Sequence, residues 1–106
     1  MIVDHERRRQ IRYPGEVIFL VIDDRSLPLI DLSPQSITFE GEDFRVGDVL
    51  RLRLVSALDD SDGILADVRV IRVEGFRVAA IFNRPTNQLE HYIGDYIALH
   101  FPVGRA

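Results

Sequence analysis

Short runs of β-branched and other apolar residues, separated by turn-forming residues, fill the chain from residue 16 to residue 82. Runs of this length and composition are typical of β-strands. Val49–Val55 shows the pattern most clearly, because its leucines alternate with Arg51 and Arg53, giving the strand one apolar and one charged face. The predicted strands are Glu16–Ile22, Leu27–Leu32, Ser36–Glu40, Val49–Val55, Ile64–Val73 and Phe76–Phe82.

Turn-forming residues predict the connections between these strands. The connections are Asp23–Ser26, the loop Gly41–Asp48, the acidic segment Ala57–Gly63, and Glu74-Gly75. Asp62-Gly63 at the end of the acidic segment is a strong signal for a hairpin turn. Within the loop Gly41–Asp48, we expect Phe44 and Val46 to pack beneath the backbone, because both side chains are apolar.

Only the C-terminal part of the chain has helical periodicity. Apolar residues from Leu89 to Ile97 recur at intervals of three and four residues, as they do on one face of an amphipathic helix. We predict a helix over residues 86–101, with a capping box formed by Asn87 and Glu90. Six short strands and one terminal helix together predict a mainly β fold. The expected architecture is a small six-stranded antiparallel (split) β-barrel with a C-terminal α-helix on its side or mouth.

The length and the charge of the chain set its class. A chain of 106 residues predicts one domain, with a flexible basic arm over 1–13, a β-barrel over 14–84 and the helix after it. The net charge of −4 argues against general binding to DNA or RNA phosphates. The polar N-terminus and the lack of a long apolar run predict a cytoplasmic protein without membrane insertion.

No residue pattern in the sequence indicates an enzyme. The chain contains no cysteine, so it has neither a thiolate nucleophile nor a cysteine-based zinc site. Ser33 has no Gly-x-Ser-x-Gly context, and the three histidines have no metal-ligand spacing. We therefore expect no catalytic residue, no metal and no cofactor, and we look for a binding function instead.

The first candidate binding segment lies near the N-terminus. Arg7, Arg8, Arg9 and Arg12 bring four of the 13 basic residues into six positions, and the chain contains no lysine. Residues 4–12 carry a charge of +2, so the remainder of the chain carries −6. Guanidinium groups match phosphate oxygens and the guanine edge geometrically, which indicates a compact anionic ligand. The alternative is a solvated basic tail that pairs with nearby carboxylates.

The second candidate is the segment Asp31-Leu32-Ser33-Pro34-Gln35-Ser36. Side chains two residues apart on an extended segment point to the same side, so Asp31 and Ser33 are expected to face one ligand. Asp31 is placed to accept from a guanine N–H edge, and Ser33 to donate to a phosphate oxygen. The alternative is a turn between two strands, in which both side chains cap their own backbone.

Taken together, the two segments resemble the PilZ domain family, whose members are bacterial receptors for the second messenger cyclic di-GMP. The family pattern is Arg-x-x-x-Arg near the N-terminus, followed by Asp/Asn-x-Ser-x-x-Gly. Arg8 and Arg12 supply the first motif, and Asp31 and Ser33 supply the second except at its last position, where Ser36 replaces glycine. The strand that ends at Phe82, followed by a helix, also looks like the closing strand and tail of the family.

The resemblance implies a six-stranded barrel that binds cyclic di-GMP across its outer face and holds it with the N-terminal arm. Carried over by position, Arg8 and Arg12 clasp guanine edges and phosphates, Asp31 reads the guanine Watson–Crick edge, and Ser33 contacts the ligand near a phosphate. Arg7 stands where an additional arginine accompanies the binding of two ligand molecules per chain. The arm is then expected to order around the ligand and to change the surface shown to a protein partner.

Ser36 is the departure that decides between two functions. If the glycine of the motif has a positive φ, serine would cost roughly 1–2 kcal/mol there; if it lets the backbone approach the ligand, the hydroxymethyl group intrudes. We expect a receptor that signals to a protein partner, as a monomer or weak dimer. The alternative is an adaptor of the same fold that has lost nucleotide binding, for example in pilus or motility machinery.

Overall fold

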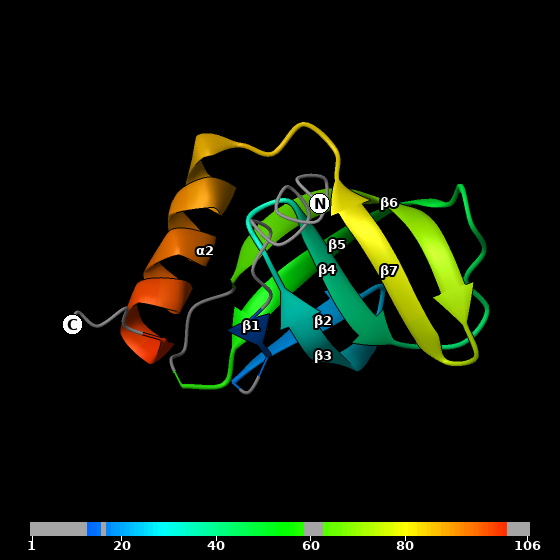
Figure 1. The fold of residues 1–106 in the computed structure, drawn as a ribbon, viewed down its shortest axis with the longest axis horizontal. Coiled ribbons are helices and arrows are strands. Elements are labelled where there is room, and N and C mark those ends of the chain that lie inside the picture. Colours follow the sequence, from blue (N-terminus) through cyan, green and yellow to red (C-terminus); the bar gives the residue numbers. More distant parts are fainter. Residues whose placement is uncertain (1–12, 16, 59–62, 102–106) are drawn as a thin grey trace, which may run out of the picture.

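The computed structural model describes residues 13–15, 17–58 and 63–101. These residues form seven strands and one helix (Figure 1). The elements are β1 (Tyr13–Pro14), β2 (Ile18–Ile22), β3 (Arg25–Leu32), β4 (Ser36–Glu40), β5 (Val49–Ser56), β6 (Ile64–Glu74), β7 (Arg77–Phe82) and α2 (Asn87–His100). No helix in the described ranges is long and apolar enough to span a membrane.

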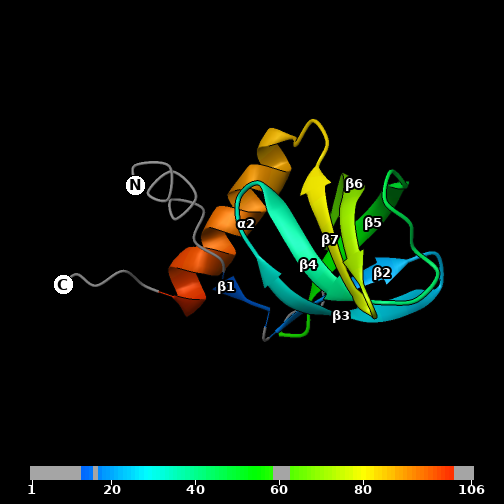
Figure 2. The same cartoon turned by 45° about the vertical axis from the view of Figure 1, so that its right-hand side comes forward.

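The six strands β2 to β7 close into an antiparallel barrel. They follow the order β3-β2-β5-β6-β7-β4, and a further pairing of β4 with β3 joins the two ends of the sheet. Figure 2 shows β3 and β4 running on one side of the barrel, with α2 at one end. The predicted mainly β fold, a six-stranded antiparallel barrel with a C-terminal helix, is confirmed.

Strand β1 was not predicted and adds a seventh strand outside the barrel. Tyr13 pairs with Leu32, and Pro14 pairs with Asp31, so β1 lies along the end of β3. Tyr13, which was predicted as the last residue of the arm, is therefore part of the sheet. Gly15 permits this close approach, because a Cβ at that position would lie 2.6 Å from the Leu29 Cγ.

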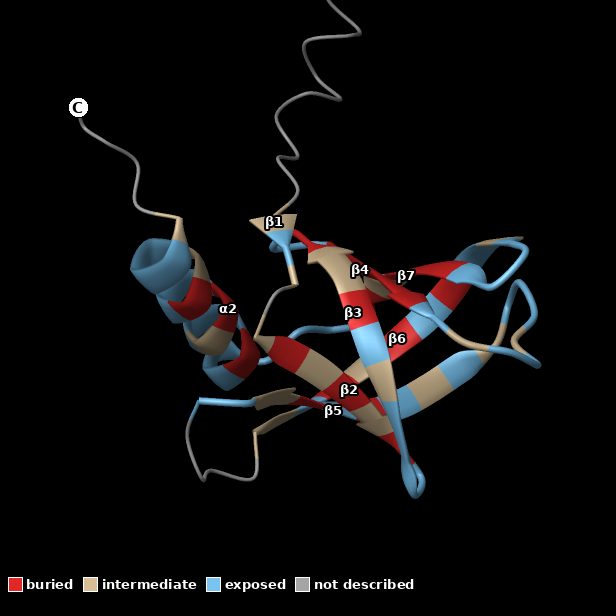
Figure 3. Cartoon of the chain, turned by 90° about the horizontal axis from the view of Figure 1, so that it is seen from below, coloured by how far each residue is buried: buried red, intermediate tan, exposed pale blue. Residues whose placement is uncertain are grey.

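Alternation along the strands builds the core inside the barrel. Leu52 and Leu54 of β5 are buried, whereas Arg51 and Arg53 between them are exposed, as the sequence predicted. Helix α2 closes one end of this core with one apolar stripe, seen in red facing the barrel in Figure 3. The buried residues of the stripe are Leu89, Ile93 and Tyr96.

Two connections differ from the predictions. Asp23 has a φ of 55°, so the β2–β3 turn is tighter than expected and β3 begins at Arg25. Val46 is 65% exposed and does not pack beneath its loop. Phe44 alone packs there, with its ring 5.3 Å from that of Phe39 in an edge-to-face contact. Apolar character alone could not separate these two side chains.

The helix occupies the predicted range, but its cap lies one residue earlier than predicted. Thr86 is the N-cap, and its hydroxyl accepts a hydrogen bond from the Leu89 backbone N–H over 3.0 Å. Asn87 is the first helical residue, so the predicted capping box with Glu90 was wrong. Thr86 satisfies the Leu89 N–H, whereas a cap at Asn87 would have accepted from the N–H of Glu90.

Candidate functional site

The arginines of the predicted arm, Arg7, Arg8 and Arg12, lie outside the described residues. The structure does place the point at which the arm joins the barrel. Tyr13 pairs with Leu32, which is the second residue of the Asp31–Ser36 segment. Five extended residues span at most ~17 Å. The chain length therefore limits the Cα atoms of Arg8, Arg9 and Arg12 to that distance from Tyr13.

Asp31 lies at one end of a row of side chains that crosses four barrel strands. It pairs with Thr38 of β4, Thr38 pairs with Ala79 of β7, and Ala79 pairs with Arg72 of β6. Directly opposed residues of antiparallel strands share a face. The core residues Leu32, Ile37, Phe39, Val78 and Ala80, which adjoin Asp31, Thr38 and Ala79 along the strands, are buried. The row therefore lies on the outer face of the barrel, where Asp31 is half-buried.

Ser33 has a different position from the one that a simple extended segment predicts. Its side chain is fully buried, and its hydroxyl accepts hydrogen bonds from the backbone N–H groups of Gln35 and Ser36, each over 3.2 Å. The Ser33 N–H also donates to the Ser36 carbonyl over 2.8 Å. Ser33 therefore builds the β3–β4 turn, which is the alternative considered for this segment.

Ser36, at the position of the motif glycine, is not strained. The described non-glycine residues with positive φ are Asp23, Asp43 and Arg84, and Ser36 is not among them. It is the first residue of β4, it is 8% exposed, and its Oγ lies 3.1 Å from the Ser33 Oγ. Of the two costs considered for serine here, backbone strain is absent, and only the space taken by the hydroxymethyl group remains.

Asp31 and Ser36 line one groove of about 330 Å³ on the outer face of β3, β4, β7 and β6. Ala79 contributes only a methyl group to its lining, so no large side chain fills the row between Thr38 and Arg72. The lining also includes Thr38, Arg72 and Arg77, which the sequence did not single out as site residues. Alternation predicts that Thr38 and Arg77 point outward, whereas Arg72 does so because the register of β6 and β7 shifts at Ile71. The place of all three in one groove with Asp31 depends on strand order and register.

A β-bulge shapes the far side of this groove. The pairing of β6 with β7 shifts between Val70 and Arg72, which leaves Ile71 as the extra residue. Both Ile71 and Arg72 are consequently exposed, and both line the groove. Bulges re-aim side chains and are common next to binding sites.

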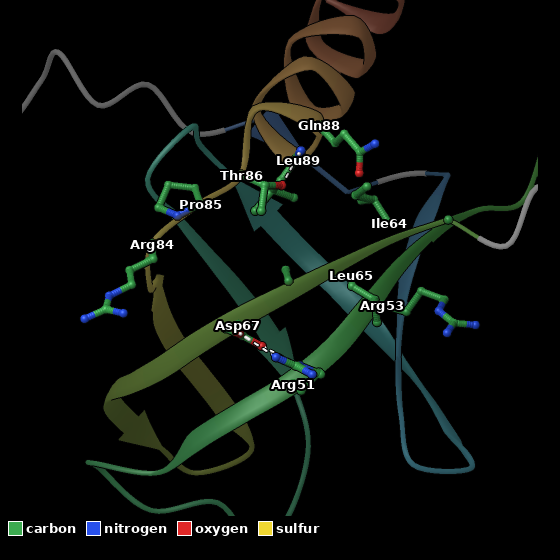
Figure 4. Close-up of a pocket in the computed structure, with 12 residues that line it drawn as sticks. Arg51, Arg53, Ile64, Leu65, Asp67, Arg84, Pro85, Thr86, Gln88 and Leu89 are labelled. Carbon is green, nitrogen blue, oxygen red and sulfur yellow. Dashed lines mark hydrogen bonds and ion pairs between the residues drawn. The ribbon is translucent and has the colours of Figure 1, made fainter.

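A larger groove of about 490 Å³ lies elsewhere, between the outer face of β5–β6 and the start of α2 (Figure 4). It contains none of the predicted site residues. Arg53 and Arg84 point away from one another at its two sides. Arg51 donates to both carboxylate oxygens of Asp67, over 2.8 Å and 3.2 Å. Size alone therefore does not make this groove the better candidate.

In the Arg51–Asp67 pair, the pKa values of both side chains are shifted by their contact with each other. The hydrogen bonds from the Arg51 guanidinium, reinforced by its charge, hold the pKa of Asp67 below the usual value of an aspartate. The same hydrogen bonds and the Asp67 charge raise the pKa of Arg51. Because both side chains are exposed, the pair contributes little to stability.

Among the residues that the structure describes, no group of three or more His, Asp or Glu side chains could hold a metal ion. His91 lies exposed on α2, and its Nδ1 is 3.1 Å from the Asn87 carbonyl oxygen. The chemistry available at the Asp31 groove is that of hydrogen-bond acceptors, hydroxyl groups and guanidinium groups, which suits the binding of a polar anion.

Comparison with known proteins supports the fold. The structure is similar to the crystal structure of an uncharacterized Legionella protein, Lpg0364, with a TM-score of 0.65 and 13% sequence identity. The similarity covers 84% of this chain and 91% of that chain. No protein-family model and no curated protein sequence matches the chain. At this level of identity, the structural similarity establishes the architecture alone.

Proposed function

We propose that the protein is a cyclic di-GMP receptor of the PilZ type, which binds the dinucleotide on the outer face of its barrel. One observation carries the proposal: β1 pairs with the end of β3, so the root of the arginine arm lies against Asp31 and Leu32. Tyr13, the residue that follows the first motif, thus pairs with Leu32 inside the second motif, and Asp31 of that second motif lines the groove.

The residues have distinct roles in this proposal. Arg8 and Arg12 reach over the groove from the arm and bind the guanine edges and phosphates of the ligand. Asp31 accepts from the N–H edge of a guanine, because its half-buried carboxylate lies at the groove. Ser33 acts by holding the turn that positions Asp31 and Ser36, since its hydroxyl is buried in that turn. Arg7 binds a second ligand molecule.

Ser36 is compatible with this function. Its backbone has no left-handed conformation to maintain, and its hydroxyl lies beside that of Ser33. A serine here narrows the groove without straining the strand. This favours the receptor over the adaptor that has lost nucleotide binding, because one of the two costs considered for serine at this position is absent.

In this proposal, the arm and helix α2 transmit the effect of ligand binding to a protein partner. The ring of Tyr13 at the arm root lies 5.3 Å from that of Phe101 at the end of α2, and Tyr96 bonds to Pro14. Ordering of the arm on the ligand would therefore alter the surface formed by β1 and the C-terminal half of α2. In this proposal, the partner recognises that surface.

Calorimetric titration of the full chain with cyclic di-GMP tests the proposal. We expect saturable binding, and a stoichiometry near two would support the role of Arg7. Arg8→Gln and Arg12→Gln should each cost ~1–3 kcal/mol of binding, the range for a lost bidentate guanine contact. Arg53→Gln is the matched control, because it removes the same charge from a different face. Absence of binding by the wild type at high micromolar ligand would favour the adaptor.

A further inference from the structure

We propose that Arg72 binds a phosphate of the ligand, at the end of the groove opposite Asp31. The inference rests on the proposed function, because it assigns a residue to the same groove. Neither sequence motif contains Arg72, and it lies about forty positions after Asp31 in the chain. Only the closure of the barrel brings these two residues to one surface.

The row Asp31–Thr38–Ala79–Arg72 sets the geometry of the site. Three strand spacings of ~4.8 Å place the backbones of Asp31 and Arg72 roughly 14 Å apart. Thr38 and Ala79 lie between them and are each 9% exposed. The row thus has a hydrogen-bond acceptor, Asp31, at one end and a cation, Arg72, at the other. A nucleotide with its base at Asp31 would extend its sugar and phosphate along the row toward Arg72.

The Arg72 guanidinium is available for an anion. The side chain is 66% exposed, because the bulge at Ile71 turns this part of β6 outward. Its ion pair with Glu74 is long, with 3.9 Å between Nε and Oε2, and the Glu74 side chain is itself 69% exposed. Such a pair holds the guanidinium weakly, so a phosphate can compete for it.

Arg77 also lines the groove, but its surroundings make it the weaker candidate. It lies directly between Glu40 of β4 and Glu74 of β6, its two cross-strand partners. These carboxylates offset the field of its guanidinium at the groove. The cross-strand partner of Arg72 is Ala79, which is uncharged. Arg77 thus has a carboxylate opposite it on both neighbouring strands, whereas Arg72 has an uncharged residue opposite it and a long ion pair with Glu74, so we assign the phosphate to Arg72.

Calorimetric titration of full-length variants with cyclic di-GMP tests the assignment. Arg72→Gln should weaken binding about tenfold, as expected for the loss of a hydrogen bond between charged groups. Glu74→Gln should tighten binding, because it removes a competitor for Arg72 and a negative charge near the phosphate. Arg53→Gln, the control for net charge, should stay within about twofold of the wild type. Urea unfolding should show all three variants as stable as the wild type.

The outcomes separate this inference from the proposed function. If the wild type binds and Arg72→Gln weakens binding no more than Arg53→Gln does, the assignment of Arg72 is overturned while the receptor function stands. If Glu74→Gln weakens binding, the assignment is overturned in the same way. If the wild type does not bind cyclic di-GMP, the proposed function fails and the phosphate role of Arg72 fails with it.

Discussion

The Tyr96 hydroxyl of α2 donates a hydrogen bond to the Pro14 carbonyl of β1 over 2.9 Å, although 82 positions separate the two residues. The rings of Tyr13 and Phe101 meet beside it, with 5.3 Å between their centroids. The short strand at which the arm begins is therefore held on one side by β3 and on the other by the C-terminal half of the helix. Strand β1 and the C-terminal half of α2 are therefore linked directly at this contact.

We expect Tyr96→Phe to weaken this link. The variant keeps the buried ring but leaves the Pro14 carbonyl without its donor, so the free energy of unfolding should fall by about 0.5–1.5 kcal/mol. In the proposed function the arm begins at β1, so the affinity for cyclic di-GMP should fall as well. Equilibrium urea unfolding and calorimetric titration measure the two effects. A variant with wild-type stability and affinity would show that the helix does not hold the arm root.

Ser33→Ala should destabilise the β3–β4 turn. The buried Ser33 hydroxyl accepts from two backbone N–H groups, and its removal leaves both without that acceptor. We expect the free energy of unfolding to fall by about 1–3 kcal/mol. Ser36→Ala is the matched control, because it removes a hydroxyl 3.1 Å away and keeps both of these hydrogen bonds. Equal losses in the two variants would contradict the role given to Ser33.

The strands of the barrel were predictable because alternation fixes which residues face the core. Arg51 and Arg53 point outward because they alternate along β5 with leucines that point into the core. The row from Asp31 to Arg72 was not predictable in this way, since it depends on strand order, register and a bulge. Local patterns determine the direction of a side chain, whereas neighbours across strands depend on closure of the whole sheet.

The turn at Ser33 shows the other limit of local patterns. An Asp-x-Ser segment suits a ligand site and a self-capping turn equally well, because the same oxygens serve both. The structure resolves the two positions differently: Asp31 lines the groove, and Ser33 turns inward. Strand β1 was not predicted because it is only two residues long, Tyr13 and Pro14, and because Pro14 followed by Gly15 is a sequence typical of a turn.

The Arg51–Asp67 pair predicts a small dependence of stability on acidity. Folding lowers the pKa of Asp67, so the stabilisation is present above the unfolded value of about 3.9 and is lost as the pH falls through the folded value. Asp67→Asn should therefore lose less stability than the wild type between about pH 5 and pH 3. Urea midpoints measured across this range test the difference. Arg51→Gln, which removes the partner of Asp67, should change the profile in the same direction as Asp67→Asn.

Gly94→Ala should stabilise the protein. Gly94 lies in the exposed part of α2, and a Cβ placed there would have no atom within 4 Å. Alanine is favoured over glycine inside a helix by about 0.5–1 kcal/mol, so the free energy of unfolding should rise by that amount. Thermal and urea unfolding measure the gain. Gly15→Ala is the opposing control, because its Cβ would lie 2.6 Å from the Leu29 Cγ. A loss of stability in Gly94→Ala would contradict the open surface described for this position.

Ser36→Gly tests the stability of the fold and the affinity for the ligand separately, at the position where the chain departs from the PilZ motif that it resembles. Ser36 begins β4 without a positive φ, so glycine brings no relief of strain and should lower the free energy of unfolding by about 0.5–1 kcal/mol. Removal of the hydroxymethyl group widens the groove, so calorimetric titration should give unchanged or tighter binding of cyclic di-GMP. Weaker binding would instead mean that the Ser36 hydroxyl itself contacts the ligand, and that this chain replaces the glycine with a binding residue.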